Sequence, residues 1–245
     1  MIFQPGFPYQ EPRLFITRMH EDFQPRLKAS DLEERAAKRL AELQAEGIPL
    51  RPVVNKTRKL AKNFWGAAWM KQLAHCESGG MCLAPGRTLL RHSCVLHVDV
   101  EPCSISALIS AEELYEVEMR LAPLDEERLE ELAACCTGRI DSLLSLLNGK
   151  TDEAVLKQLC HPETGLLPTP EDWSMSCTCP DWAEPCPHAA AAIYAIGCLI
   201  DEDPTLLFTL RGISPEHLIA SPTPPVELNT AQLASMFGID LDMGH

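Results

Sequence analysis

Four side chains that bind zinc in many proteins lie within twelve consecutive positions of the chain. They are Cys177, Cys179, Cys186 and His188. Three thiolates and one imidazole form a standard tetrahedral set for structural Zn²⁺, and such a set leaves no coordination position for a catalytic water. The spacing therefore predicts one structural zinc ion, held by these four residues in a site that performs no chemistry itself.

The sequence around these ligands predicts a hairpin followed by a helix. Side chains two positions apart in a strand share a face, so an extended segment would present the first two sulfurs to one ion. The second ligand pair flanks Pro187, which the first turn of a helix tolerates, and the alanine-rich run 189–196 favours a helix. The dipole of that helix favours a thiolate at Cys186. Trp182, in the turn, is expected to cover the site as an apolar lid.

Other interpretations of these residues stay open. The four could be ordinary buried side chains, or Cys186 and His188 could act as nucleophile and base, although no third group that would orient the base is evident nearby. A second metal site is a further alternative, with looser spacing across a loop; its candidate ligands are His75, Cys76, Cys82, His92 and Cys94. We find no phosphate-binding glycine-rich loop, no paired catalytic carboxylates and no nucleophile elbow, so we expect that the protein is not an enzyme.

The segment 176–188 resembles the SWIM zinc finger, whose pattern is Cys-x-Cys, a variable spacer and then Cys-x-His. Roughly residues 30–220 are similar to bacterial SWIM proteins that are often encoded beside SWI/SNF-type helicase-like ATPases. The motifs that carry this similarity are FWGAAW at 64–69, LYEV at 114–117, IDSL at 140–143, TGLLP at 164–168 and LFTLRG at 207–212. The resemblance implies a non-catalytic adaptor or accessory protein whose partner is a helicase-like ATPase acting on DNA.

The chain departs from that family at two places that concern nucleic acid. Pro187 stands where relatives tend to have a basic residue between the last Cys and the His. The segment 85–91 reads PGRTLLR, so it lacks two cations and an aromatic residue of the family pattern. Because Lys and Arg supply the attraction for phosphates and aromatic rings stack on bases, we expect the finger itself to bind nucleic acid poorly.

Charge is distributed unevenly along the chain, whose net charge is −14. Up to Lys71 there are 13 Lys and Arg against 8 Asp and Glu, a net of +5, which leaves 8 against 27, a net of −19, for the remainder. The stretch 51–71 contains no acid, and its first five cations are candidates for binding nucleic acid or a partner: Arg51, Lys56, Arg58, Lys59 and Lys62. A direct nucleic-acid-binding module that uses this stretch is the alternative function, and a plain solvated surface is the other interpretation.

Periodic patterns predict several helices. A capping box at Ser30 and Glu33 opens a helix that closes at Gly47. Trp65 and Trp69 lie on one side of a second helix, where they are expected to pack in the core. Apolar residues from 129 to 147 predict one long helix that ends at Gly149, and a shorter helix follows.

Alternating apolar and polar residues between 94 and 121 predict a three-stranded antiparallel sheet with one wet face. Helices would cover its other face, so the expected fold class is α+β, with a zinc-binding hairpin-plus-helix. We expect four segments: 1–29 as an irregular N-terminal arm, 30–170 as the α+β domain, 171–220 as the SWIM zinc finger and following helices, and 221–245 as a Pro-rich linker and short C-terminal helix.

Composition bounds the cellular setting. Hydrophobic residues make up 46% of the 245 residues, enough for a sizeable core. Eleven cysteines without a secretory signal favour a reducing compartment, and we therefore expect a cytoplasmic protein. The longest apolar run, 189–200, is shorter than the ~20 residues that a membrane helix needs, so no membrane association is expected.

Overall fold

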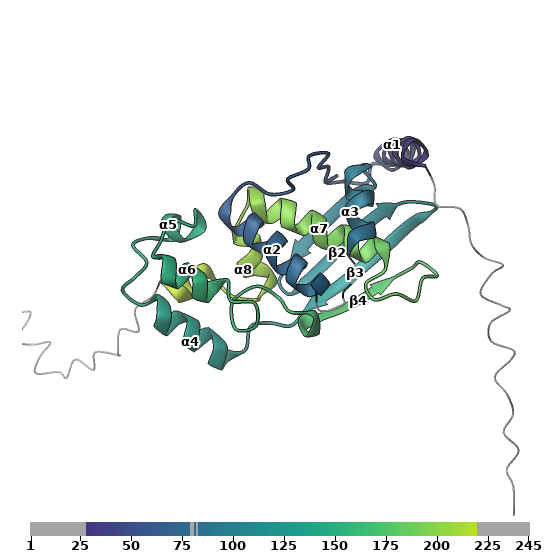
Figure 1. Ribbon diagram of the computed structural model, residues 1–245. Coiled ribbons are helices and arrows are strands. Elements are labelled where there is room, and N and C mark those ends of the chain that lie inside the picture. The colour runs from purple at the N-terminus through teal and green to yellow at the C-terminus, as the bar shows by residue number, and fades with distance from the viewer. Residues whose placement is uncertain (1–27, 79–80, 82, 220–245) are drawn as a thin grey trace, which may run out of the picture.

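The computed structural model describes residues 28–78, 81 and 83–219. The expected Pro-rich linker and C-terminal helix lie outside these residues, and so does the expected N-terminal arm apart from its last two positions. Within the described residues the protein has α+β architecture, as the sequence predicts, with helices packed on an antiparallel sheet (Figure 1).

The sheet has four strands, so the prediction of three strands is wrong in number. The strands lie in the order in which they occur along the chain: β1 Val95–Glu101, β2 Ser104–Ser110, β3 Leu114–Leu121 and β4 Trp173–Cys177. The first three form the predicted meander. The added strand β4 pairs with β3 over the register Leu121↔Trp173 to Val117↔Cys177, which ends at the first predicted zinc ligand.

The two faces of the sheet differ in burial, which confirms the predicted wet face. Along β3, every second residue from Tyr115 to Leu121 is buried, whereas Glu116, Glu118 and Arg120 are exposed. Burial of the apolar set is the main stabilisation of this strand, because only the core side is removed from water.

Helix α7 Pro187–Glu202 packs on all four strands at the buried face, and α2 Phe64–Ser78 and α3 Ala84–Arg91 pack on α7 (Figure 1). Helix α7 is central, and its residues 188–200 are all buried. Trp65 and Trp69 are at most 1% exposed, as predicted for core residues. The Nε1 atom of Trp69 donates a hydrogen bond to the carbonyl of Ile193, 3.1 Å away, and this bond ties α2 to α7.

Close packing of α3 on α7 depends on Gly86. A Cβ atom at this position would lie 2.3 Å from the backbone of Ala190 and of Ala191. Glycine therefore permits a distance between the two helix backbones that no other residue would allow. This contact fixes the start of α7, where the last two candidate ligands lie.

Helix α1, Ala29–Ala45, packs through Ala36 and Leu43 against Leu96 on the other side of β1. The predicted capping box is wrong, because the helix begins earlier: the carbonyl of Lys28 accepts the first backbone hydrogen bonds and no side chain caps this end. Gly47, with φ of +79°, follows the helix as predicted.

The predicted long helix over 129–149 is also wrong, because it is two helices, α4 Glu126–Cys136 and α5 Leu143–Leu147. The chain turns at Gly138, where φ is +68°, and Ser142 caps the second helix with its hydroxyl. These helices lie with α6 Glu153–Leu159 at one end of the molecule (Figure 1).

The C-terminal part of the described chain joins the same core. It contains η1 Pro170–Asp172 before β4, and α8 Thr205–Leu210 and η2 Pro215–Leu218 after α7. One hydrophobic cluster includes residues from Leu32 to Leu218, so the sequence ranges 30–170 and 171–220 share a core. A buried ion pair, Arg211 Nη1 to Asp172 Oδ2 at 3.0 Å, fixes the chain just before β4. No helix of the described residues is long and apolar enough to cross a membrane.

Candidate metal centre

The four predicted ligands come together at the junction of β4 and α7. Cys177 ends the strand, Cys179 follows in the loop, Cys186 is the N-cap of the helix, and His188 lies in its first turn. The ligand atoms of these residues all lie within 4.8 Å of one another. They form a Cys₃His group positioned to hold a metal ion.

The distances inside the group suit a small tetrahedral ion. The Nδ1 atom of His188 lies 3.8 Å from the sulfur of Cys177 and 4.0 Å from that of Cys186. With Zn–S bonds of about 2.3 Å and Zn–N bonds of about 2.0 Å, neighbouring ligand atoms of a tetrahedral zinc site are about 3.5–3.8 Å apart. Three thiolates and one imidazole are also a soft donor set, which selects zinc over magnesium or calcium.

Backbone pairing positions the first half of the group. The backbone N–H of Thr178 donates to the carbonyl of Glu116, 3.1 Å away, and the Thr178 hydroxyl accepts from the Glu116 N–H at 3.0 Å. These bonds hold the chain against β3 one residue beyond β4, so Cys177 points with the other odd-numbered residues of β4 toward the core face.

The N-terminus of α7 positions the second half. Cys186 Sγ accepts the backbone N–H of Ala189 at 3.4 Å, as a helix cap does, and Pro187 lies in the first turn as the sequence predicts. A hydrogen bond with the Cys177 thiol is the largest cause that lowers the pKa of Cys186, and contacts with His188, with this N–H and with Cys179 lower it further. The site therefore favours a thiolate at the helix N-terminus, in agreement with the expectation from the helix dipole.

Tyr115 is a contact of the group that sequence reasoning missed. Its ring lies over the imidazole of His188, with centroids 4.0 Å apart and planes inclined by 32°. His188 is 6% exposed, so this packing limits rotation of its ring while Nδ1 faces the sulfurs. Burial raises the pKa of the Tyr115 phenol. The available signal was its position on the apolar side of β3, two residues before Val117, the partner of Cys177.

Trp182 does not cover the group, so the prediction of an apolar lid is wrong. Its side chain is 98% exposed. The loop from Asp181 to Glu184 is exposed throughout, and a side-chain turn in which Asp181 Oδ1 accepts the Ala183 N–H at 3.0 Å shapes it. His188 is instead covered by Tyr115 and by the body of the protein.

The second metal site suggested by the sequence does not form among the residues that the structure describes. Within them, the Cys₃His group is the only set of three or more possible ligands whose ligand atoms lie close enough together to share one metal ion. Of its candidate ligands, Cys82 lies outside those residues. Cys94 is fully buried, and its pKa is raised to about 12 by burial. His92 instead approaches Glu33, with Nδ1 to Oε1 at 3.2 Å.

The basic candidates lie along the irregular connection between α1 and α2. All five side chains are exposed: Arg51, Lys56, Arg58, Lys59 and Lys62. Lys56 is paired with Glu33 of α1 at 3.3 Å, which neutralises part of the stretch. The backbone N–H of Lys62 donates to the carboxylate of Asp201, so an acid from α7 also lies beside this segment.

Comparison with known proteins gives one distant relative and no function. The chain is 25% identical over 165 residues to a protein named Uncharacterized protein Rv2102 from Mycobacterium tuberculosis. The match covers 66% of this chain and 59% of that protein, so it spans less than two thirds of the relative's length. No family model matches the chain. No solved structure matches it either.

Proposed function

We propose that this protein is a zinc-binding adaptor of the SWIM type. One Zn²⁺ bound by Cys177, Cys179, Cys186 and His188 would join the end of β4 to the start of α7. The observation that supports this is the Cys₃His group itself, with all four ligand atoms within 4.8 Å of one another. A set of three thiolates and one imidazole has no vacant position for water, so its role is structural.

The proposed partner is a helicase-like ATPase that acts on DNA. This step depends on the resemblance of 176–188 and its neighbouring motifs to bacterial SWIM proteins. Charge supports an accessory role, because residues after Lys71 carry a net charge of −19 and would repel a polyanion. A partner would then supply the positive surface that holds DNA. Three metal-binding thiols also require a reducing compartment, for which we propose the cytoplasm.

Direct binding of nucleic acid through residues 51–71 is the second candidate function. The observation in its favour is that Arg51, Arg58, Lys59 and Lys62 are all exposed on one connecting segment. Their charges would attract phosphates, but the nearby acids Glu33 and Asp201 offset them.

Elemental analysis of the purified protein tests the metal proposal. We expect one zinc per chain, loss of zinc in Cys179→Ser, and full zinc content in Cys135→Ser, which changes a partly buried cysteine of α4 outside the group. Two zinc ions per chain, or unchanged zinc in Cys179→Ser, would show that the ligands are wrong.

A pull-down with the tagged, zinc-loaded protein, read by mass spectrometry, tests the adaptor proposal. We expect a helicase-like ATPase among the retained proteins, and we expect Cys186→Ser to lose it. If nuclease treatment removes every retained protein, the proteins were held only through bound nucleic acid, and that result would favour the second candidate function.

A further inference from the structure

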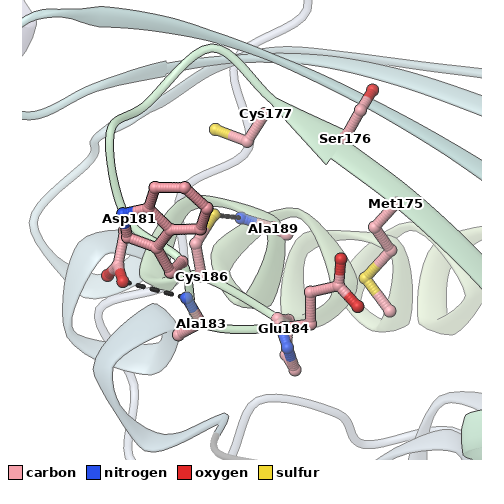
Figure 2. Close-up of a pocket in the computed structure, with 10 residues that line it drawn as sticks. Met175, Ser176, Cys177, Asp181, Ala183, Glu184, Cys186 and Ala189 are labelled. Carbon is pink, nitrogen blue, oxygen red and sulfur yellow. Dashed lines mark hydrogen bonds between the residues drawn. The ribbon is translucent and has the colours of Figure 1, made fainter.

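A hollow of about 270 Å³ lies beside the metal centre, between β4 and the loop that leads to α7. Figure 2 shows Met175, Ser176 and Cys177 along the strand on one side, and Asp181, Ala183 and Glu184 along the loop on the other. Cys186 and Ala189, at the start of α7, also line it. The hollow is therefore bounded by an edge strand, an acidic loop and a helix N-terminus.

Among the described residues, the strand that borders the hollow has no partner on its outer edge. β4 is the last strand of the sheet, and its partner β3 occupies one side only. Thr178 bonds through its backbone to Glu116, and hydrogen-bonded pairs alternate in an antiparallel ladder. The backbone N–H and C=O groups of Cys177 and Met175 therefore point away from β3, toward the open edge. Such an edge can accept an added strand.

The surroundings of the hollow are acidic and carry a large apolar side chain. Asp181 and Glu184 are exposed on the loop. A Zn²⁺ ion bound by the three thiolates would add one net negative charge, because two positive charges would meet three negative ones. Trp182 lies between the two acids in sequence and is 98% exposed, which makes it the most exposed large apolar side chain among the described residues.

We propose that this hollow binds an extended, basic segment of a protein partner, which adds as a strand to β4. Its Lys or Arg side chains would pair with Asp181 and Glu184, and an apolar side chain would pack on Trp182. Tryptophan is enriched among the residues that dominate protein interfaces, and Trp182 is almost fully exposed in the free protein. This inference depends on the adaptor function proposed above, because it specifies the surface that the partner would use.

The acidic border decides between a peptide and a nucleic acid. An exposed Trp can stack on a base, as on single-stranded nucleic acid, but such sites combine the aromatic ring with a positive groove. Here both charged residues beside Trp182 are acids, and the finger has Pro187 where a cation would be needed. Repulsion of phosphates therefore favours a cationic peptide.

Binding of defined peptides to the zinc-loaded full chain, measured by fluorescence anisotropy, is the test. The probes are a labelled peptide of alternating Lys and Val, the matching peptide of Glu and Val, a Lys and Val peptide with methylated backbone nitrogens, and oligo-dT. We expect only the first to bind. Backbone methylation should abolish binding, because an added strand must donate hydrogen bonds to the edge of β4.

Two variants locate the binding site. We expect Trp182→Ala to weaken binding about tenfold or more, and Asp181→Asn/Glu184→Gln to weaken it about threefold or more and reduce its salt dependence. Matched controls are Leu144→Ala, which removes a 70% exposed side chain on α5, and Glu130→Gln/Glu131→Gln, which removes two exposed acids of α4. Zinc content of each variant shows that the site is intact.

Several results would overturn the proposal. These are no binding of the basic peptide, equal binding of the acidic peptide, tighter binding of oligo-dT that depends on Trp182, or self-association that Trp182→Ala abolishes.

The pull-down distinguishes failure of this inference from failure of the proposed adaptor function. If wild type and Trp182→Ala retain the ATPase equally, the hollow is the wrong surface and the adaptor function stands. If wild type retains no ATPase but binds the basic peptide, the hollow stands and its partner belongs to another class.

Discussion

The Cys₃His group and the basic stretch were both recognisable as candidate sites from the sequence, but the structure brings together only the side chains of the first. The group lies where β4 ends and α7 begins, and its four ligand atoms meet within 4.8 Å. The basic side chains lie along an irregular connection, and Lys56 is already paired with Glu33. One candidate site is therefore assembled by secondary structure, whereas the other is a row of solvated charges with acids beside it.

The difference reflects how far apart in sequence the residues that determine each site lie. Ligands a few residues apart are positioned by the strand and helix that carry them, so spacing alone predicts the cluster. The net charge of a surface depends on residues that are distant in sequence. Glu33 is 23 positions before Lys56, and Asp201 is 139 positions after Lys62. Spacing motifs are thus better predictors of sites than charge clusters.

Removal of zinc should reduce the stability of the protein more than any other change that we propose. Structural zinc contributes roughly 10–16 kcal/mol of apparent binding free energy in small modules. We expect Cys186→Ser, or chelation, to lower the Tm by about 10 °C or more, since each kcal/mol corresponds to roughly 2–4 °C at this size. Differential scanning calorimetry measures the shift, with Cys135→Ser as the control.

Hydrogen exchange shows how far the loss of zinc spreads. From sequence alone, the hairpin and the helix after His188 would melt while the 94–121 sheet stays folded. In the structure α7 is buried along residues 188–200 and packs on α2 and α3, so we expect loss of protection only in 173–188. Uniform loss across the chain would mean that the metal site and the core unfold as one unit.

Gly86→Ala should damage the metal site from outside it. The new methyl group would lie 2.3 Å from the backbone of Ala190, so α3 and α7 must separate. We expect a loss of about 1–3 kcal/mol in the free energy of unfolding, typical of overpacking, and weaker zinc retention against a chelator. Urea unfolding and competition with a zinc indicator measure these effects. Thr88→Ala, at an exposed position of α3, is the control; unchanged zinc retention in Gly86→Ala would show that the site does not depend on helix packing.

Much of the fold was predictable because its periodicity is local. The meander follows from alternation within short segments, and the Trp pair follows from spacing on one side of a helix. Strand β4 has the same signal, since Trp173, Met175 and Cys177 alternate with two serines, but it is only five residues long and its partner β3 is more than fifty positions away. The break near Gly138 was missed because apolar residues kept a helical period across it.

At the site, the ligands were predictable and their surroundings were not. Tyr115 packs on His188 because β3 pairs with β4, a contact between residues 73 positions apart. Trp182 was expected to cover the site as an apolar lid, but the turn after Asp181 leaves it exposed. Side-chain type alone therefore does not tell a lid from a surface residue.

A triple change in the basic stretch should alter nucleic-acid binding without altering the protein. We expect wild type to bind single- and double-stranded DNA weakly, in the ~10⁻⁴–10⁻⁶ M range of non-specific contacts, with steep salt dependence. Arg58→Ala/Lys59→Ala/Lys62→Ala should remove this binding while zinc content stays the same and stability changes by less than about 0.5 kcal/mol. Fluorescence anisotropy at two salt concentrations measures it. Nanomolar binding at physiological salt would show that the basic stretch is a nucleic-acid-binding site and not a row of solvated charges.

The smallest effect concerns Glu33, the acid that neutralises part of the basic stretch. Hydrogen bonds from His92 and Lys56 lower the pKa of this carboxyl below its ordinary value. A lowered pKa means that the ionised carboxylate stabilises the fold at pH values above the unfolded-state pKa, and that this contribution is lost as the pH falls through the folded-state pKa. Glu33→Gln should therefore unfold at slightly lower urea than wild type at pH 7, and the difference should shrink below about pH 4.3, the ordinary Glu pKa. Because the carboxyl faces solvent, we expect a small effect at pH 7 that added salt reduces further.

Glu34→Gln, an exposed neighbour on α1, is the matched control. A difference that persists unchanged at low pH would show that Glu33 acts through packing rather than charge, and Lys56 would then be as free to meet a polyanion as the other cations of the stretch.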